Sequence, residues 1–239
     1  MTVEHLERIL ALTWPGLERD QVGDWLLRAG RGVTSRANSA LVLGDPGRPH
    51  EDALDAVVSW YRARGLCPRL QIADCAHREV DAACARRGWA ASSSAWVMTR
   101  SAVLDASAGA PLLGRQRPAA LPDVEVEWSD APPSTTDRDR AAEQTATPAL
   151  YATLCVGGAA VGWGRLAVVE GCGVVTDLEV EPDRRNQGVG ADLLEALCCK
   201  ASESGATQVA LQVLVNNPAH RLYRRLGFSE HHAYHYRTG

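Results

Sequence analysis

Apolar and polar positions form short blocks through the second half of the chain, and the blocks change period in a regular order. Four blocks of apolar or alternating residues predict strands, at 124–128, 150–156, 160–169 and 174–180. Gly157-Gly158 predicts a hairpin turn between the second and third. The remaining blocks predict a helix, a strand, a short helix and a strand, at 190–204, 208–215, 220–226 and 231–236.

The predicted helix 190–204 has the period of a helix that lies against a sheet. Its apolar positions share one face and are Leu193, Leu194, Leu197, Cys198 and Ala201. Gly205 predicts a left-handed residue that ends it. Before the second strand, the polar stretch 131–149 holds at most one short helix, near 136–145.

The first half repeats this order in outline. Its blocks predict strands at 25–28, 39–43 and 69–73, a strand from Gly88-Trp89 to Met98, and helices at 51–64 and 78–87. The spacing from Gly65 to Gly88 is 23 residues, against 22 from Gly205 to Gly227. We interpret this as a tandem repeat, with a generic alternation of strands and helices as the alternative.

The stretch 101–123 is rich in Ala, Gly and Pro and has no sustained period, which is typical of a linker. It divides the chain into a domain of residues 1–100, the linker 101–123 and a domain of residues 124–239. Two domains of this size are ordinary for 239 residues.

Composition narrows the class of protein. A net charge of -4 argues against non-specific nucleic-acid binding. The chain lacks the ~18–20 consecutive apolar residues that cross a membrane, and its start lacks the pattern of a signal peptide. These features predict a cytoplasmic protein. Its seven cysteines include no Cys-x-x-Cys pair and are expected to be mostly buried, with at least one of Cys198 and Cys199 inside.

The segment from Val174 to Phe228 contains the residues that indicate a binding site and a catalytic group. An apolar strand leads into a glycine-containing loop that opens directly into a helix. The first backbone N–H groups of a helix and the positive end of its dipole form a binding site for a phosphate or pyrophosphate. A tyrosine about 35 residues further on, after the next strand, offers a phenol that can act as an acid.

Two motifs in this segment resemble the acetyl-CoA signature of the GNAT superfamily of N-acetyltransferases. The first is Arg185-x-x-Gly188-x-Gly190 after Val180-x-Pro182, and the second is Asn216-x-x-Ala219-x-x-x-Tyr223-x-x-x-Gly227-Phe228. The resemblance covers roughly 124–239. It implies an α/β (α+β) fold of tandem GNAT-like domains, each a mixed, mostly antiparallel sheet flanked by helices, with a degenerate N-terminal copy.

The resemblance also implies the cofactor and its contacts. Acetyl-CoA would bind without a metal, its pantetheine arm against the main chains of Leu178 and Val180. Arg185 would add charge or brace the loop, and Asn216 would contact the cofactor arm, with Asn217 as a substitute or simply a turn residue. Backbone N–H groups would bind the pyrophosphate along Asn186, Gln187, Gly188, Val189, Gly190 and Ala191.

The implied reaction is acetyl transfer to an amine by direct attack in a ternary complex. Tyr223 matches the tyrosine that protonates the leaving thiolate. Thr176 stands where several members carry a base, and strand alternation turns Asp177 and Glu179 to the opposite face. A β-bulge can turn one of them inward, so Glu179 and Asp177 are both candidate bases, although a water chain or an already neutral amine is the preferred alternative.

The acceptor is expected to be a small-molecule or peptide amine. Because 131–149 is short, the missing wall of the acceptor pocket is expected from the first half, with Trp25, Arg36 and Asn38 as contributors. The first half's own loop, 44–50, contains prolines and Asp45 and is expected to bind no CoA.

Other interpretations stay open. The chain could use another acyl-CoA, or be a CoA-binding sensor or scaffold without turnover. It could also form a homodimer. His231, His232 and His235 suggest a role at the surface or in the acceptor pocket rather than a metal site, because they lie on both faces of a strand.

Overall fold

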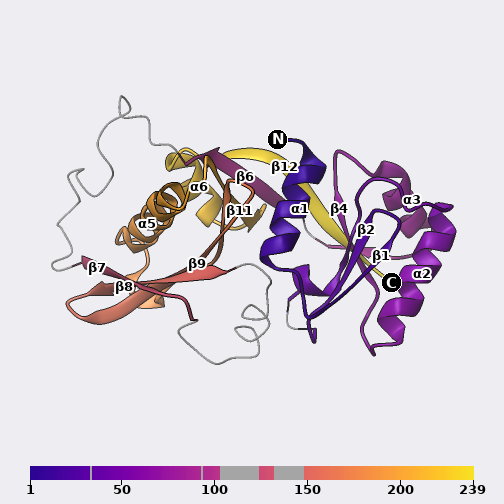
Figure 1. The fold of residues 1–239 in the computed structure, drawn as a ribbon, viewed down its shortest axis with the longest axis horizontal. Coiled ribbons are helices and arrows are strands. Elements are labelled where there is room, and N and C mark those ends of the chain that lie inside the picture. Colours follow the sequence, from indigo (N-terminus) through magenta and orange to yellow (C-terminus); the bar gives the residue numbers. More distant parts are fainter. Residues whose placement is uncertain (33, 93, 103–123, 132–147) are drawn as a thin grey trace.

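The computed structural model describes residues 1–32, 34–92, 94–102, 124–131 and 148–239. The predicted short helix near 136–145 and nearly all of the predicted linker lie outside these ranges. One twelve-stranded sheet runs through the described chain (Figure 1). Its strands are β1 (Glu18–Val22), β2 (Trp25–Ala29), β3 (Ala40–Leu41), β4 (Arg69–Ala73), β5 (Ala90–Ala91), β6 (Ala95–Ser101), β7 (Val124–Ser129), β8 (Ala149–Val156), β9 (Ala159–Val169), β10 (Cys172–Val180), β11 (Gln208–Leu214) and β12 (Ser229–Thr238).

The two halves of the chain exchange strands in this sheet. The order is β1-β2-β3-β4-β12-β6-β11-β10-β9-β8-β7, with β5 beside β12. The last strand of the chain, β12, therefore lies between β4 and β6 of the first half, and β6 lies between β12 and β11 of the second. Most pairs are antiparallel, as expected for the fold class. The predicted division into 1–100 and 124–239 thus runs through a shared sheet.

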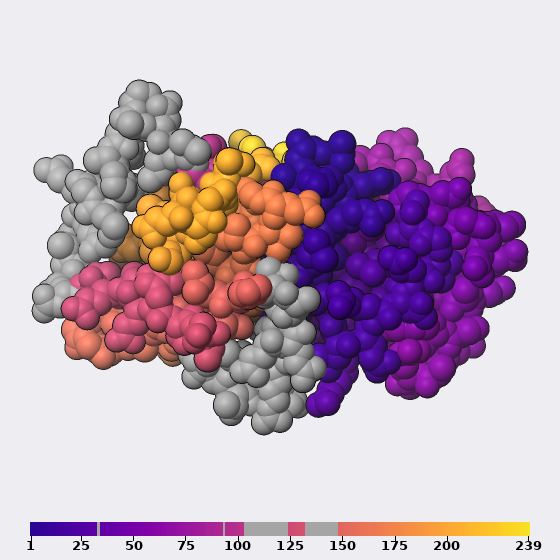
Figure 2. Space-filling model, in the orientation of Figure 1, coloured from indigo at the N-terminus to yellow at the C-terminus, as the bar shows by residue number. Residues whose placement is uncertain are grey.

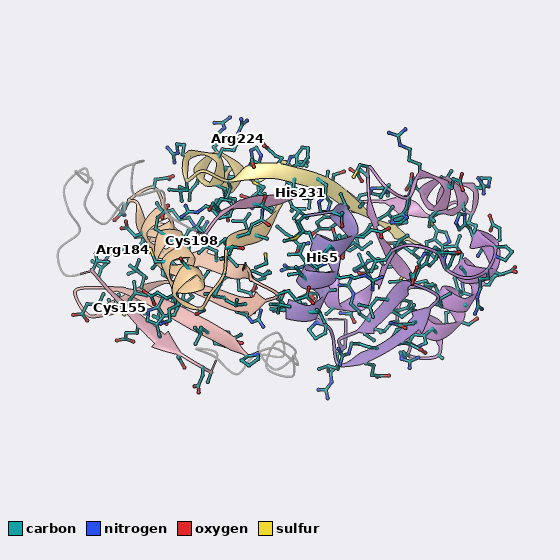
Figure 3. All side chains as sticks on the ribbon, turned by 45° about the horizontal axis from the view of Figure 1, so that its top comes forward. His5, Cys155, Arg184, Cys198, Arg224 and His231 are labelled. Atoms are coloured by element: carbon teal, nitrogen blue, oxygen red, sulfur yellow. The ribbon has the colours of Figure 1, made fainter. Side chains whose placement is uncertain are left out.

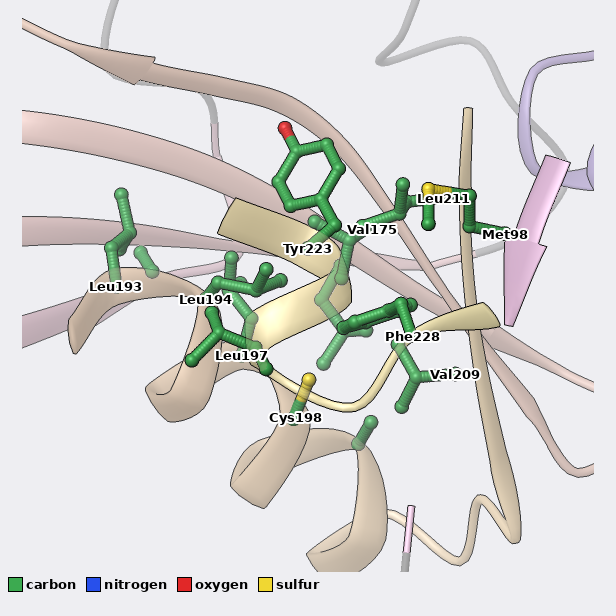
Figure 4. Close-up of a cluster of buried hydrophobic side chains, with 14 of the residues drawn as sticks. Met98, Val175, Leu193, Leu194, Leu197, Cys198, Val209, Leu211, Tyr223 and Phe228 are labelled. Atoms are coloured by element: carbon green, nitrogen blue, oxygen red, sulfur yellow. The ribbon is translucent and has the colours of Figure 1, made fainter. Parts of the chain in front are cut away.

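Helices cover both faces of the second half's sheet. Helices α5 (Val189–Glu203) and α6 (Ala219–Arg225) pack on one face, which we call the α5 face. Their buried side chains and those of the sheet form a hydrophobic core there, part of which is drawn in Figure 4. Helix α1 (Val3–Thr13) packs on the opposite face, the α1 face, with Leu6, Ile9 and Leu10 against β6, β10 and β11. Its Ala11 also packs against β3 of the first half. Helix α1 therefore joins the halves, and Figure 2 shows its indigo atoms against orange atoms of the second half.

The first half has a separate hydrophobic core, formed by its own helices and strands. Helices α2 (His50–Arg62) and α3 (Arg78–Arg86) pack on β2, β3 and β4 through residues such as Leu54, Val57 and Val80. Strands β3 and β4 are parallel and are connected through α2, just as β10 and β11 are parallel and connected through α5. The order of elements in the two halves corresponds, while the degenerate first copy stays a prediction.

Most predicted elements of the sequence are present within a few residues. The turn residues Gly157 and Gly158 have φ of 58° and 77°, and Gly205 ends α5 with φ of 85°. Each of the five predicted apolar positions of α5 is buried. Helix α1, strand β1 and the 3₁₀ turn η1 (Arg36–Asn38) were not assigned from the sequence, and β6 extends to Ser101, into the predicted linker.

The cysteines follow their expectation in part. Cys198 is fully buried and Cys199 half-buried. Burial also raises the pKa of the Cys198 thiol to about 12. Cys67 and Cys75 are exposed, so burial is not general.

Helix α5 packs directly on two glycines of the sheet, Gly164 of β9 and Gly173 of β10. An added Cβ at Gly173 would come 2.7 Å from Cβ of Ala201, and one at Gly164 would come 2.7 Å from Cδ1 of Leu197. These contacts are too short for real atoms. The close approach fixes the height of α5 above β9 and β10, and therefore the position of its first turn.

Substituting these glycines is expected to test this packing. Gly173→Ala should lower the free energy of unfolding by about 1–3 kcal/mol, because the Ala201 methyl is fixed to the helix backbone. Gly164→Ala should cost less, because a Leu197 rotamer change can relieve it. Chemical denaturation of both variants measures the difference. Equal losses, or a larger loss for Gly164→Ala, would contradict this account of the helix position.

Candidate functional site

Strands β10 and β11 part halfway along their length. They pair only from Cys172 with Gln208 to Val175 with Leu211. Beyond that point β10 continues to Val180 beside β9, and β11 continues to Leu214 beside β6. The two strands diverge into a fork, the β10/β11 fork. The backbone of Leu178 and Val180 lies on one arm of it, where an extended ligand can add as a further strand.

A β-bulge on β10 changes which side chains face the fork. Thr176 pairs with Arg165, and Glu179 pairs with Trp163, so one extra residue stands on β10 between them. Arg165 and Trp163 are two residues apart on β9 and share the α1 face, so Thr176 and Glu179 share it too. Without the bulge, Glu179 would face α5. Asp177, at the bulge, has φ of 52°.

The loop after β10 leads into the first turn of α5. Gly188 precedes the helix with φ of 94°, and Asn186 has φ of 60°. Arg185 donates from Nε to the Val180 carbonyl at 3.2 Å, and Gln187 donates from Nε2 to the Asp183 carbonyl at 2.7 Å. The first bond ties the loop to the end of β10, and the second lies within the loop. The sequence left two roles open for Arg185, which were to add charge or to brace the loop. Its bond to the Val180 carbonyl corresponds to the second role.

The other predicted cofactor residues have two different surroundings. Val189 is buried in the core beneath α5, so it contributes backbone rather than side chain. An added Cβ at Gly190 would lie 3.5 Å from Val180 and 3.6 Å from Leu222 of α6, so this glycine fills the junction of β10, α5 and α6. No atom of the described residues would lie within 4 Å of a Cβ on Gly188. Space therefore remains above the loop at Gly188, where the sequence places the pyrophosphate.

Tyr223 lies on α6 at the edge of the core on the α5 face. Its ring is 6.2 Å from that of Phe228, and its side chain is 8% exposed. Figure 4 shows the hydroxyl directed away from Leu194, Leu197 and Cys198. Burial raises the pKa of the Tyr223 phenol above its usual value of 10. The hydroxyl therefore stays protonated at neutral pH and is available as a proton donor.

The two asparagines before α6 differ in role. Asn217 accepts a hydrogen bond from the Ala219 N–H through Oδ1 at 2.9 Å, which satisfies the start of the helix. Asn216 is exposed in the turn that follows β11. Asn217 is thus the turn residue, and Asn216 remains the candidate for the cofactor arm.

A second group of polar residues lies at the α1 side of the fork, and the sequence motifs did not reveal most of it. Arg165 is fully buried, with Nη1 3.5 Å from Oγ1 of Thr176. Its guanidinium lies 5.1 Å from the centre of the Trp14 ring. Burial, and to a smaller extent Arg36, lowers the pKa of Arg165, while Tyr151 and Asp177 oppose this. No motif in the sequence indicates that Arg165 would be fully buried next to the fork.

Of the three residues of the first half that were expected at the acceptor pocket, Arg36 reaches the fork. Arg36 donates from Nη1 to Oε1 of Gln212 at 2.8 Å, at the fork. Trp25 is fully buried in the first half's core beside His50, and Asn38 accepts hydrogen bonds from the Gly30 and Gly32 N–H groups. The expectation for Trp25 and Asn38 was wrong, because both build the first half rather than the fork.

The three histidines of β12 hold the halves together. His232 bonds Glu7 of α1 at 2.8 Å, and His231 contacts the Met1 carbonyl at 3.1 Å. Figure 3 shows His231 on β12 and His5 on α1 near the middle of the molecule. His235 bonds Asp74 and Asp81 on opposite sides of its ring. Within the described ranges, no group of three or more His, Cys, Asp or Glu side chains is arranged to hold a metal.

A cavity of about 390 Å³ lies in the first half, between β4, α3 and β12, away from the fork. Its walls include Asp74, Asp81, His235 and Arg237. Asp81 binds Arg237 through two hydrogen bonds as well as His235, and these contacts lower the pKa of Asp81. These four charged groups are therefore paired with one another.

The loop of the first half that corresponds to 185–190 is occupied by the chain's own carboxylates. The N–H groups of Gly44, Asp45 and Gly47 donate to Glu4, Asp24 and Asp45, at 2.8–3.0 Å. A phosphate would have to displace these acceptors. The observation supports the expectation that this loop binds no CoA.

Comparison with known proteins gives matches over the whole chain. The family model described as "Probable histone acetyltransferase Rv0428c C-terminal" matches residues 2–237. The "Uncharacterized N-acetyltransferase YobR" of Bacillus subtilis (strain 168) is 25% identical over 249 residues, which cover 98% of each chain.

Solved structures share the fold. A GCN5-related N-acetyltransferase from Kribbella flavida has a TM-score of 0.72 at 16% identity and covers 100% of this chain and 96% of its own. A tandem GNAT protein from the clavulanic acid biosynthesis pathway has a TM-score of 0.62 at 15% identity, over 90% of this chain and 78% of its own. The matches span both halves, whereas the motifs lie in the second. No helix in the described ranges has the length and apolar character needed to span a bilayer.

Proposed function

The chain is an acyltransferase of the Rv0428c C-terminal family, within the GNAT N-acetyltransferases, and on that premise we propose that it transfers an acetyl group from acetyl-CoA to an amine. The observation that carries this proposal is the β10/β11 fork, which opens next to the first turn of α5. A pyrophosphate at that turn and a pantetheine arm along β10 would bring the thioester into the fork. The second half is thus the proposed catalytic domain.

Binding would rest on the backbone. The N–H groups from Asn186 to Ala191 would bind the pyrophosphate, and the helix dipole adds to the attraction. Leu178 and Val180 would pair with the amides of the pantetheine arm, while the exposed Asn216 would contact the arm from the turn that follows β11. Arg185, held on the Val180 carbonyl, would keep the loop in this shape.

Acid and base would act from opposite sides of the fork. Glu179 lies on the α1 face with Thr176 and would take the proton of the incoming amine. Tyr223 lies on α6 at the α5 face and would protonate the departing thiolate. The amine nitrogen would attack the thioester carbonyl directly in a ternary complex, so that the C–N bond forms as the C–S bond breaks. Most of the rate would come from positioning and from a polarised carbonyl.

Glu179→Gln is expected to lower kcat/KM by about 100-fold at neutral pH, because the amide cannot accept the proton. The rate should recover as pH rises and the free amine becomes neutral. Asp177→Asn, at the bulge, is the matched control and should have a smaller effect. Amine-dependent release of CoA thiol measures both. An unchanged rate for Glu179→Gln, with the same pH profile as the wild type, would assign the proton to water instead.

A CoA-binding sensor is the rival function, and the same assay separates it. A sensor binds acetyl-CoA and releases no thiol above background with any amine. Arg165 and Thr176 are buried polar residues on the α1 face of the fork, from which the amine would approach. They favour an enzyme, because a sensor has no need of polar side chains beside the thioester.

A further inference from the structure

We propose that the acceptor is a small amine that also carries a carboxylate, and that Arg36 of the first half binds this carboxylate at the β10/β11 fork. The inference rests on the proposed function and names its substrate class. It makes the first half part of the acceptor site, through one side chain from η1.

The position of Arg36 is the first step. Gln212, which accepts its hydrogen bond, is the first residue of β11 beyond the last pair with β10, Val175 with Leu211. Gln212 pairs with Val97, which lies in the core beneath α1, so Gln212 is on the α1 face. Thr176 and Glu179 are on that same face across the fork. Arg36 therefore reaches the side of the fork from which the amine would approach.

The second step is how Arg36 is held. Its guanidinium lies 5.5 Å from the centre of the Trp14 ring, and Arg165 contacts the same ring. Trp14 is itself buried and donates from Nε1 to Oγ1 of Thr34 at 3.0 Å. A guanidinium has five N–H donors, and the bond to Gln212 uses one. A fixed guanidinium with further donors is suited to a carboxylate.

The third step is charge. With the described residues Arg36 forms hydrogen-bond and ring contacts but no ion pair, and it is half-buried. Arg165 brings a second positive charge to the same ring, and Asp177 acts electrostatically on Arg165. Two guanidinium groups held together repel each other, and an anion placed between Arg36 and the fork relieves this repulsion.

The charges of the side chains on the two arms of the fork then indicate which groups the acceptor carries. Glu179 on β10 suits an ammonium group, and Arg36 at β11 suits a carboxylate. A small amino acid presents both groups, whereas a lysine-rich peptide brings further positive charge to Arg36 and Arg165. The site therefore favours an amino-acid-like acceptor over a basic protein tail.

Matched acceptor pairs test the proposal. Each pair is an amino acid with a single carboxylate and its carboxamide, such as glycine with glycinamide and alanine with alaninamide, with a lysine-rich peptide for contrast. Thiol release gives kcat/KM, and the shift in Tm with CoA present reports binding when turnover is absent. The carboxamide amine loses its proton more readily, so intrinsic reactivity favours the amide. A preference for the acid of about tenfold or more is expected in at least one pair.

Variants assign the preference to Arg36. Arg36→Gln should bring the ratio of acid to amide to about one, and Arg36→Lys should keep part of it, since a charge remains. Arg48→Gln, an exposed arginine of the first half, is the control and should match the wild type. Acetyl-CoA affinity, measured by calorimetry, should be equal in the four proteins, which shows that each is folded.

The outcomes are distinguishable from failure of the proposed function. Equal turnover and equal Tm shifts for acids and amides, a preference for the lysine-rich peptide, or a preference that survives in Arg36→Gln would each overturn the acceptor proposal. Acetyl-CoA binding and amine-dependent thiol release would stand in all three cases. If acetyl-CoA does not bind, the proposed function itself fails.

Discussion

Gly188→Glu is expected to weaken acetyl-CoA binding by at least about 100-fold. Two effects combine. Gly188 has φ of 94°, where a side chain strains the backbone by roughly 1–3 kcal/mol and shifts the loop. A carboxylate at this position also lies where the pyrophosphate would bind, so like charges repel at the start of α5. Isothermal calorimetry of acetyl-CoA with wild type and variant measures the loss.

Gly158→Glu is the control for this substitution. Gly158 has φ of 77° in the β8–β9 turn, and an added Cβ would meet no atom within 4 Å among the residues that the structure describes, as at Gly188. The two variants therefore carry similar backbone strain and the same charge, but Gly158 lies in the β8–β9 turn and not in the loop that opens α5. Wild-type affinity in Gly158→Glu is expected. An equal loss in both variants would mean that strain or charge, rather than the cofactor site, explains the result.

Tyr223→Phe is expected to lower kcat by about 100-fold with little change in acetyl-CoA affinity, because a general acid acts mainly in the transition state. The phenylalanine ring preserves the packing against Phe228. Single-turnover thiol release together with calorimetry separates chemistry from binding. A loss of affinity with unchanged kcat would instead make Tyr223 a packing residue.

The pH dependence of this acid follows from its burial. Because burial raises the pKa of Tyr223, the phenol keeps its proton through neutral and mildly alkaline pH. Loss of rate from its ionisation is therefore expected only above pH ~10. Tyr61→Phe is the matched control. The Tyr61 hydroxyl donates to the Arg28 carbonyl at 2.9 Å within the first half's core, so its removal should lower stability and leave kcat unchanged.

Local signals were sufficient for much of the fold and for the cofactor loop. The period of α5, the Gly157-Gly158 turn and the motif around Gly188 each depend on neighbours in sequence, and each is present in the structure. Features that depend on pairing between strands could not be decided from such local signals. The bulge at Asp177 was an open alternative, because alternation alone turns Glu179 away from Thr176, and only the pairing with β9 reverses it.

Contacts distant in sequence could not be predicted. The insertion of β12 between β4 and β6 depends on pairs of residues that are 130 or more positions apart, which no local pattern encodes. The buried ion pair of Arg100 on β6 with Glu195 on α5, at 2.8 Å, joins the halves in the same way. Trp14 and Arg165 meet only because α1 crosses onto the second half's sheet. The acceptor side was therefore the part least accessible from sequence.

Stoichiometry of acetyl-CoA binding tests the central claim most directly. In the first half, Glu4, Asp24 and Asp45 accept the N–H groups that a phosphate would need, whereas the second half has the loop of Gly188 beside the β10/β11 fork. Calorimetric titration of the wild-type chain should therefore give one acetyl-CoA per chain. A value of two would show that the first half also binds the cofactor, and no binding would contradict the assignment of the fork as an acetyl-CoA site.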